Sequence, residues 1–149
     1  MIKIALTVLL SLSICLSVAS TTALAQIVVI VNPANPYSDI SKKELSKIFK
    51  QKRKTWKNKG VIHVVQLPKE HPLREEFSKK VLKMSSEALE KYYFKKALSG
   101  KGQPPKILSS PSEVKSYVSG NENAIGYIDA SDVDTSVKIL KVDGKDHIE

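Results

Sequence analysis

Residues 26–36 read QIVVIVNPANP, and this stretch decides the fold class. Its first six residues are almost all apolar and β-branched, which is typical of a strand buried on both faces. Pro33 and Pro36 then end the strand, because proline cannot donate a hydrogen bond to a central ladder. A strand covered on both faces indicates an α/β domain in which helices lie on the two sides of a sheet.

Helix signals follow at regular intervals along the chain. The segments 41–44 (SKKE) and 110–113 (SPSE) are capping boxes, which predict helices over residues 42–50 and from Pro111 onwards. A proline at a first helical position, Pro72, and a cap at Ser85 or Ser86 predict two more helices between them. Each of these two carries apolar residues four apart on one face: Leu73, Phe77 and Val81 in the first, and Leu89, Tyr93 and Ala97 in the second.

Strands are predicted over residues 61–67, 124–129 and 137–142. The order β-α-β-α-α-α-β-β predicts a three-layer α/β domain with a mostly parallel or mixed sheet, formed by residues 26–142. Residues 143–149 form a polar tail that we expect to fray.

The N-terminal residues predict export. Lys3 is the only charged residue before an apolar run over residues 4–18, and Ala23-Leu24-Ala25 follows, which together are typical of a secretory signal peptide cleaved after Ala25. We therefore predict residues 1–25 to be a signal peptide and the mature protein to be periplasmic. A transmembrane anchor needs roughly 20 apolar residues, more than this run contains. A lipoprotein would use Cys15, but Ile14 before it is too bulky for the usual lipidation box.

Cleavage would remove Cys15, the only cysteine, and lower the formal net charge from +9 to +8 by the loss of Lys3. Without cysteines, thiolate catalysis and cysteine metal sites are excluded, and stability depends on a packed core. Export excludes nucleic acid as a partner and leaves anionic solutes, anionic membrane surfaces and acidic proteins. The alternative is that these lysines, which are scattered over most of the chain, simply form a solvated surface without a specific partner.

Motifs for catalysis or for metal binding are not found. There is no G-x-S-x-G, no H-x-x-x-H and no nucleotide-binding glycine loop. The three histidines, His63, His71 and His147, share no local motif. Asp129, Asp132 and Asp134 are typical of turns, because they lack the glycine and distal glutamate of a calcium loop. The sequence therefore predicts neither an enzyme nor a bound metal or cofactor.

Anion binding at a helix N-terminus is the chemistry that remains. Strand 61–67 leads through a loop into the helix that begins at Pro72, and the first turn of a helix offers free N–H groups and the positive end of its dipole. Lys69, His71 and Arg74 add positive charge and donors there, so we predict these three residues to contact the anion. A helix that is merely well capped is the alternative, and Glu70, Glu75 and Glu76 favour it.

Three stretches resemble the phosphate-type substrate-binding proteins of ABC transporters. Residues 39–49 with Trp56 and Gly60 resemble that family's "L-s-x-x-x-L-x-x-I-F-x-G-k-x-x-x-W-x-x-G" segment, and residues 123–128 (NAIGYI) are similar to its "g-A-I-G-Y-v" strand. Residues 64–77 resemble its phosphate loop, "strand, acidic loop, S-G-T-r-x-x-F". In this loop His71, Pro72 and Leu73 replace the serine, glycine and threonine, Leu67 replaces an arginine, and Arg74 keeps the pattern.

The resemblance implies one lobe of a type II periplasmic binding protein, a fold whose full-length members close two lobes around the ligand. It implies a non-enzymatic protein that binds phosphate or a similar oxyanion for transport or sensing, with a membrane permease or sensor as its partner. Because one lobe leaves the ligand open to water, we expect weak binding unless a homodimer or a partner supplies the second wall. The alternative is an interaction module without a ligand, which docks on a membrane sensor or an acidic protein through residues 50–59.

Overall fold

The computed structural model describes residues 24–57 and 59–149, so the predicted signal peptide lies almost entirely outside the described residues. Strand β1 (Ile27–Val31) is buried along its whole length and lies between two antiparallel neighbours, β7 (Ala124–Asp129) and β8 (Lys138–Val142). Its continuous apolar sequence therefore corresponds to a central strand, as predicted.

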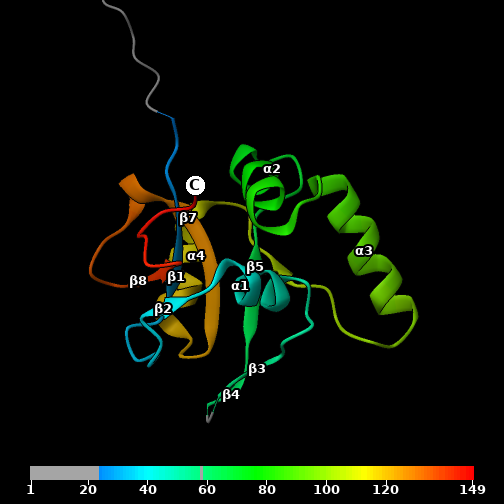
Figure 1. The fold of residues 1–149 in the computed structure, drawn as a ribbon, viewed down its shortest axis with the longest axis horizontal. Helices are drawn as coiled ribbons and strands as arrows, with labels where there is room; N and C mark the ends of the chain where they lie inside the picture. Colours follow the sequence, from blue (N-terminus) through cyan, green and yellow to red (C-terminus); the bar gives the residue numbers. More distant parts are fainter. Residues whose placement is uncertain (1–23, 58) are drawn as a thin grey trace, which may run out of the picture.

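The sheet is mixed and has the strand order β2-β8-β1-β7-β5-β6. Strand β5 (His63–Gln66) runs parallel to β7 and to the short edge strand β6 (Lys106–Ile107), while β2 (Asp39–Ile40) runs parallel to β8 at the other edge. A separate hairpin consists of β3 (Thr55–Trp56) and β4 (Gly60–Val61). Figure 1 shows this hairpin at the end of the molecule opposite to α2 (Pro72–Phe77).

Two neighbouring residues of β7 show which helices cover which face of the sheet. Tyr127 stacks on Phe77 of α2, with 4.0 Å between the ring centroids, and also contacts Phe49 of α1 (Lys42–Phe49). Gly126 points to the opposite face, where the nearest side chains to an added Cβ atom include those of α4 (Pro111–Gly120). Because successive residues of a strand face opposite sides, α1 and α2 form one outer layer and α4 forms the other. The three-layer prediction is confirmed.

Helix α3 (Ser86–Leu98) lies at the side of the molecule, next to α2 (Figure 1). Leu89 and Tyr93 are buried as their spacing predicted, but Ala97 is exposed, so its assignment to the same buried face was wrong. The later turns of α3 instead contact the end of α1 through Tyr92 and Lys96, which bond to main-chain oxygens there. The face of α3 that contacts the rest of the protein therefore includes Tyr92 and Lys96 and leaves Ala97 outside.

The C-terminal tail is polar, as predicted, but it does not fray. The Ile148 side chain is buried, and its N–H donates to the Ile27 carbonyl oxygen over 2.8 Å. Asp143, at φ 52°, accepts a hydrogen bond from the Lys42 N–H and so holds the start of the tail against α1. A single apolar residue in a charged segment is enough to pack the tail over the end of β1.

In the ranges 24–57 and 59–149, no helix combines the length and the apolar character that crossing a membrane requires.

Candidate functional site

The loop before α2 does not bring the three predicted anion contacts together. The Arg74 side chain is only 1% exposed, its Nη2 lies 2.5 Å from a carboxylate oxygen of Glu90, and its Nη1 donates to the Leu67 carbonyl over 2.8 Å. Lys69 points to solvent and reaches Glu70 at 4.0 Å. The buried Arg74 side chain therefore links this loop to α3, whereas Lys69 is an exposed cation.

The N–H groups in the first turn of α2 already have acceptors. The Leu73 N–H donates to His71 Nδ1 over 3.2 Å, and those of Arg74 and Glu75 donate to the His71 carbonyl over 3.0 and 3.3 Å. Pro72 has no N–H to offer. His71 thus acts as the N-cap of α2, a role that sequence reasoning missed because imidazole is not among the usual caps. Anion binding by Lys69, His71 and Arg74 remains a prediction, and it requires this loop to rearrange.

A buried network of neutral groups lies beneath that loop. The Tyr127 hydroxyl donates to Gln66 Oε1 over 2.6 Å, Gln66 Nε2 donates to the Tyr93 hydroxyl over 3.2 Å, and this hydroxyl donates to the Phe49 carbonyl over 2.6 Å. Burial raises the pKa of both tyrosines above their ordinary value, so the phenols stay protonated. The network stabilises the junction of β5, β7, α1 and α3 and supplies no charge to a ligand.

A different feature of the chain gathers positive charge on one surface. Residues 45–69 contain no Asp or Glu but eight Lys and Arg residues, and residues 91–112 contain no Asp or Glu but five lysines. These two acid-free segments, far apart in sequence, meet where α1 and α3 end. Part of the first segment, residues 50–59, was predicted to form a docking surface, but the second segment was not predicted to join it.

Side chains of one acid-free segment bond to the main chain of the other. Lys96 Nζ donates to the carbonyl oxygens of Lys50 and Gln51, over 2.9 and 2.8 Å. Lys54 Nζ donates to the Lys101 carbonyl over 2.8 Å, and Gln51 Nε2 donates to the Gln103 carbonyl. The carbonyls at the end of α1 attract Lys96 because the helix dipole is negative there. The fold therefore holds both basic segments side by side.

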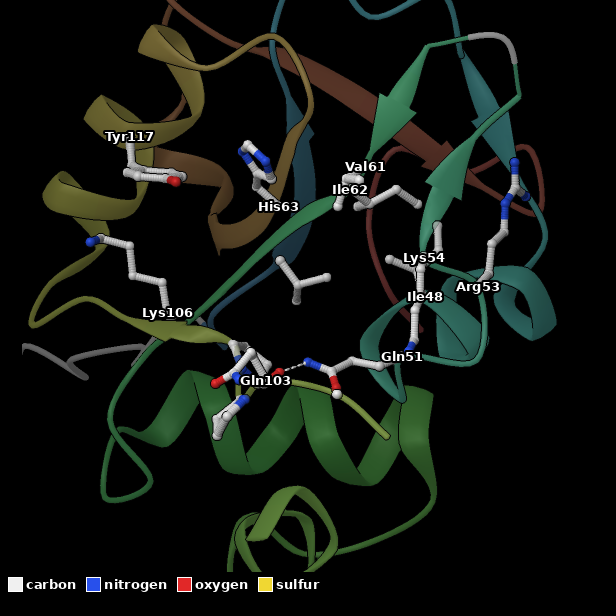
Figure 2. Close-up of a pocket in the computed structure, with 14 residues that line it drawn as sticks. Ile48, Gln51, Arg53, Lys54, Val61, Ile62, His63, Gln103, Lys106 and Tyr117 are labelled. Carbon is white, nitrogen blue, oxygen red and sulfur yellow. Dashed lines mark hydrogen bonds between the residues drawn. The ribbon is translucent and has the colours of Figure 1, made fainter. Parts of the chain in front are cut away.

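A cavity of about 340 Å³ opens between these segments, beside the start of β5; we call it the basic pocket (Figure 2). Its walls are largely apolar and include Ile48, Ile62, Val64, Pro105 and Tyr117. Its polar lining includes Gln51, Lys54, His63, Gln103 and Lys106. Of the described residues that line it, none is an aspartate or a glutamate.

The cations around the basic pocket differ in how far they are neutralised. Arg53 is paired with Glu44 at 3.3 Å, and Figure 2 shows its guanidinium pointing away from the other lining side chains. Lys106 Nζ lies 5.6 Å from the centroid of the Tyr117 ring. Burial, followed by repulsion from Lys52, Lys54 and Lys101, lowers the pKa of Lys96. Positive charges here destabilise one another, and an anion would relieve that repulsion.

Comparison with known proteins identifies the family. The family model for the PBP superfamily domain matches residues 19–148. The chain belongs to the PBP superfamily. A search of curated protein sequences found no match.

Solved structures show the same relationship. One from Clostridium perfringens, described as a phosphate ABC transporter substrate-binding protein with bound phosphate, is 31% identical, with a TM-score of 0.68 over 81% of this chain and 46% of that one. An ABC-type phosphate transport receptor from Vibrio cholerae is 23% identical, with a TM-score of 0.67 over 83% of this chain and 48% of that one. PstS from Borrelia burgdorferi is 16% identical, with a TM-score of 0.63. The chain thus spans about half the length of the solved structures it matches, which confirms the prediction of one lobe.

In this PBP superfamily chain, most of the large aromatic side chains are packed into the protein and are not displayed for a ligand to stack on. Trp56, Tyr93 and Tyr127 are buried, and Tyr92 and Tyr117 are half-buried. Among residues 24–57 and 59–149, no three His, Cys, Asp or Glu side chains come close enough to hold a metal ion. The arrangement offers cations and a cavity, which are the components of a binding site.

Proposed function

We propose that the protein is a non-enzymatic, periplasmic solute-binding protein for phosphate or a similar oxyanion, and that it serves transport or sensing through a membrane permease or sensor. The observation that carries the proposal is the kinship with the Clostridium perfringens protein described with bound phosphate, at 31% identity over 81% of this chain. The excess of lysine supports an anionic ligand.

The loop that contains Lys69, His71 and Arg74 is the proposed place of contact, and its geometry implies weak binding. The first-turn N–H groups of α2 are occupied, Glu90 neutralises Arg74, and a single lobe leaves the anion in water. We expect inorganic phosphate to bind the monomer with a Kd of about 1 mM or weaker, which corresponds to roughly 4 kcal/mol.

Equilibrium dialysis with labelled phosphate, on protein shown to be monomeric by light scattering, tests this affinity. The double variant Lys69→Gln/His71→Asn should weaken binding, because asparagine keeps the helix cap while both potential contacts are lost. Lys57→Gln, a charge-matched change on the exposed β3–β4 hairpin, should leave it unchanged. Micromolar binding by a monomer, or equal effects of both variants, would contradict the proposed site and its weakness.

The second candidate function is a ligand-free interaction module, and the meeting of the two acid-free segments favours it. Such a surface would dock on a membrane sensor or an acidic protein by charge complementarity. A thermal-shift panel of inorganic anions separates the two functions, because a ligand that binds the native state raises the Tm by mass action. A flat panel, together with salt-sensitive capture of an acidic polypeptide such as polyglutamate, would favour the interaction module.

A further inference from the structure

We infer that the basic pocket binds an organic anion, a small molecule in which a phosphate or carboxylate group is attached to an apolar body. This goes beyond the proposed function, because it concerns another place and another class of ligand. The basic pocket flanks the start of β5, whereas the loop predicted for inorganic phosphate follows the end of that strand.

The walls of the pocket argue for the apolar body of the ligand. Ile48 comes from α1, Ile62 and Val64 come from the β5 segment, and Pro105 and Tyr117 also line the cavity. Figure 2 shows Tyr117 across the cavity from Ile48. A volume of about 340 Å³ lies within the range of roughly 300 to 1,000 Å³ found for small-molecule sites, which are mostly apolar with a few polar groups. Inorganic phosphate would leave most of this apolar surface in contact with water.

The rim of the pocket argues for the anionic group. Lys54 and Lys106 lie on different sides of the cavity, and His63 projects from β5 between them (Figure 2). In the part of the chain that the structure describes, no ion pair joins Lys54 or Lys106 to a carboxylate. A bound anion would therefore meet unneutralised cations, and nothing of its own sign among the lining residues.

The pocket is shaped by contacts that keep its two sides together. The bond from Gln51 to the Gln103 carbonyl joins the end of α1 to the loop before β6. Gly102 permits this approach, because a Cβ atom at that position would lie only 2.6 Å from Gln51 Oε1. Gln51 itself adopts a left-handed backbone with φ 55°, which a residue with a side chain adopts at some cost. The cavity thus belongs to the folded architecture and is not a gap between loose surface side chains.

Three probes separate the contributions of charge and apolar area. Phenyl phosphate carries both, inorganic phosphate carries the charge alone, and benzyl alcohol carries the ring alone. Titrations followed by amide chemical shifts in ¹H–¹⁵N spectra report both affinity and place. We expect phenyl phosphate to shift the amides of Gln51, His63, Gly102, Gln103 and Lys106 saturably, with an affinity at least about tenfold higher than either other probe, because the ring adds apolar burial to the charge contact.

Variants then test the pocket. Lys54→Gln/Lys106→Gln should weaken phenyl phosphate binding about fivefold or more. The matched control Lys43→Gln/Lys83→Gln removes two exposed lysines outside the pocket lining and should have little effect. Val64→Phe keeps every charge but fills the cavity, and should abolish binding while circular dichroism shows a folded protein.

Several results would overturn the inference: no saturable shift at the pocket, equal binding of benzyl alcohol, or undiminished binding by folded Val64→Phe. Phenyl phosphate shifts confined to residues 69–76, and lost in Lys69→Gln/His71→Asn, would support the proposed function and contradict this inference. Phenyl phosphate shifts at the pocket, with no response of residues 69–76 to inorganic phosphate, would support this inference and contradict the proposed function. The two proposals can therefore fail independently.

Discussion

Gly126 of β7 lies against side chains of α4 and of the neighbouring strand β5. A Cβ atom at this position would lie 2.7 Å from Val114 Cγ1 and 2.8 Å from Val65 Cγ2, both buried methyl groups. Gly126→Ala should therefore destabilise the protein by about 2 kcal/mol, as overpacking of a tight core does. Urea unfolding measures the change. Gly120→Ala, at the end of α4 with nothing within 4 Å of the added atom, is the matched control and should change stability little; equal losses would refute the packing argument.

The buried Arg74 depends on a single carboxylate. Glu90→Ala would leave the guanidinium without its ion-pair partner while the side chain stays 1% exposed. Glu90 itself is 43% exposed, so solvent screens part of this pair, and the loss should lie below the roughly 3 kcal/mol of a fully buried pair. We expect a loss of about 2 kcal/mol by urea unfolding. Glu87→Ala removes a carboxylate of the same helix whose pair with Lys91 is exposed, and should cost less than about 1 kcal/mol. A small effect of Glu90→Ala would show that water reaches Arg74.

This burial explains why the sequence could not specify the candidate site at the level of single residues. Arg74 was predicted from its position to face an anion, but its orientation depends on Glu90, which is distant in sequence and belongs to another helix. Likewise, His71 accepts a hydrogen bond from the Leu73 N–H of its own helix, so this N–H has a partner without a ligand. The sequence shows which residues carry charge, whereas tertiary contacts decide whether each charged side chain faces solvent or an internal partner.

At the scale of elements, Glu75 links α2 to α3. Its carboxylate accepts hydrogen bonds from the Ser86 hydroxyl and from the Ser86 N–H, the latter over 2.8 Å, and it pairs with Lys79 at 2.9 Å. These contacts, the Ser86 hydroxyl first, hold the pKa of Glu75 at about 2, below its ordinary 4.5. A lowered pKa means that the carboxylate stabilises the fold fully above its ordinary pKa, and that this stabilisation is lost as the pH falls from about 5 towards 2.

Glu75→Gln should therefore lower the urea midpoint at pH 6, flatten its decline between pH 5 and pH 2, and match the wild type near pH 2. Glu76→Gln removes a neighbouring carboxylate of α2, whose half-exposed pair with Lys80 does not reach α3, and should keep the wild-type slope. If the slope of Glu75→Gln also stayed unchanged, the link between α2 and α3 would not depend on this carboxylate.

The elements themselves were largely predictable, because each long one carries a local signal. The serines at positions 41, 85 and 110 cap their helices as predicted, accepting bonds from N–H groups three residues later over 3.1 to 3.2 Å. The strands β2, β3 and β6 were not predicted, since each is only two residues long and shows no periodicity. Val61 was assigned to the strand predicted over residues 61–67, but it belongs to β4, and β5 begins at His63. The pairing of these short strands depends on where the chain passes along a sheet edge or folds into a hairpin, and that is a property of the whole fold.

At the scale of the whole molecule, the chain corresponds to about half of the solved structures it resembles. In a two-lobed protein the ligand can be enclosed, where low dielectric strengthens each contact. Here Lys54 and Lys106 are exposed beside an open pocket. The acid-free runs were visible in the sequence, but their meeting follows from the positions of α1 and α3, which only the structure provides.

Repulsion among these cations should make stability depend on salt in an unusual direction. Residues 24–149 carry a formal charge of +8, since Lys3 is the only charged residue before them. Such an excess destabilises the compact state, and salt screens it as the Debye length falls from about 30 Å at 0.01 M to about 8 Å at 0.15 M. Exposed ion pairs weaken with salt as well, but each contributes too little to reverse the sign.

We therefore expect the Tm to rise by roughly 2 to 5 °C between 10 and 200 mM NaCl. Lys52→Gln/Lys54→Gln removes two of the charges that repel Lys96, so this variant should begin at a higher Tm in low salt and gain less from added NaCl. Lys141→Gln/Lys145→Gln, which removes two lysines paired with Asp146 and Glu149, is the charge-matched control and should not begin higher. A wild-type Tm that falls with salt would mean that attractive ion pairs outweigh the lysine repulsion. The repulsion between the two acid-free segments would then be too weak to favour binding of an anion.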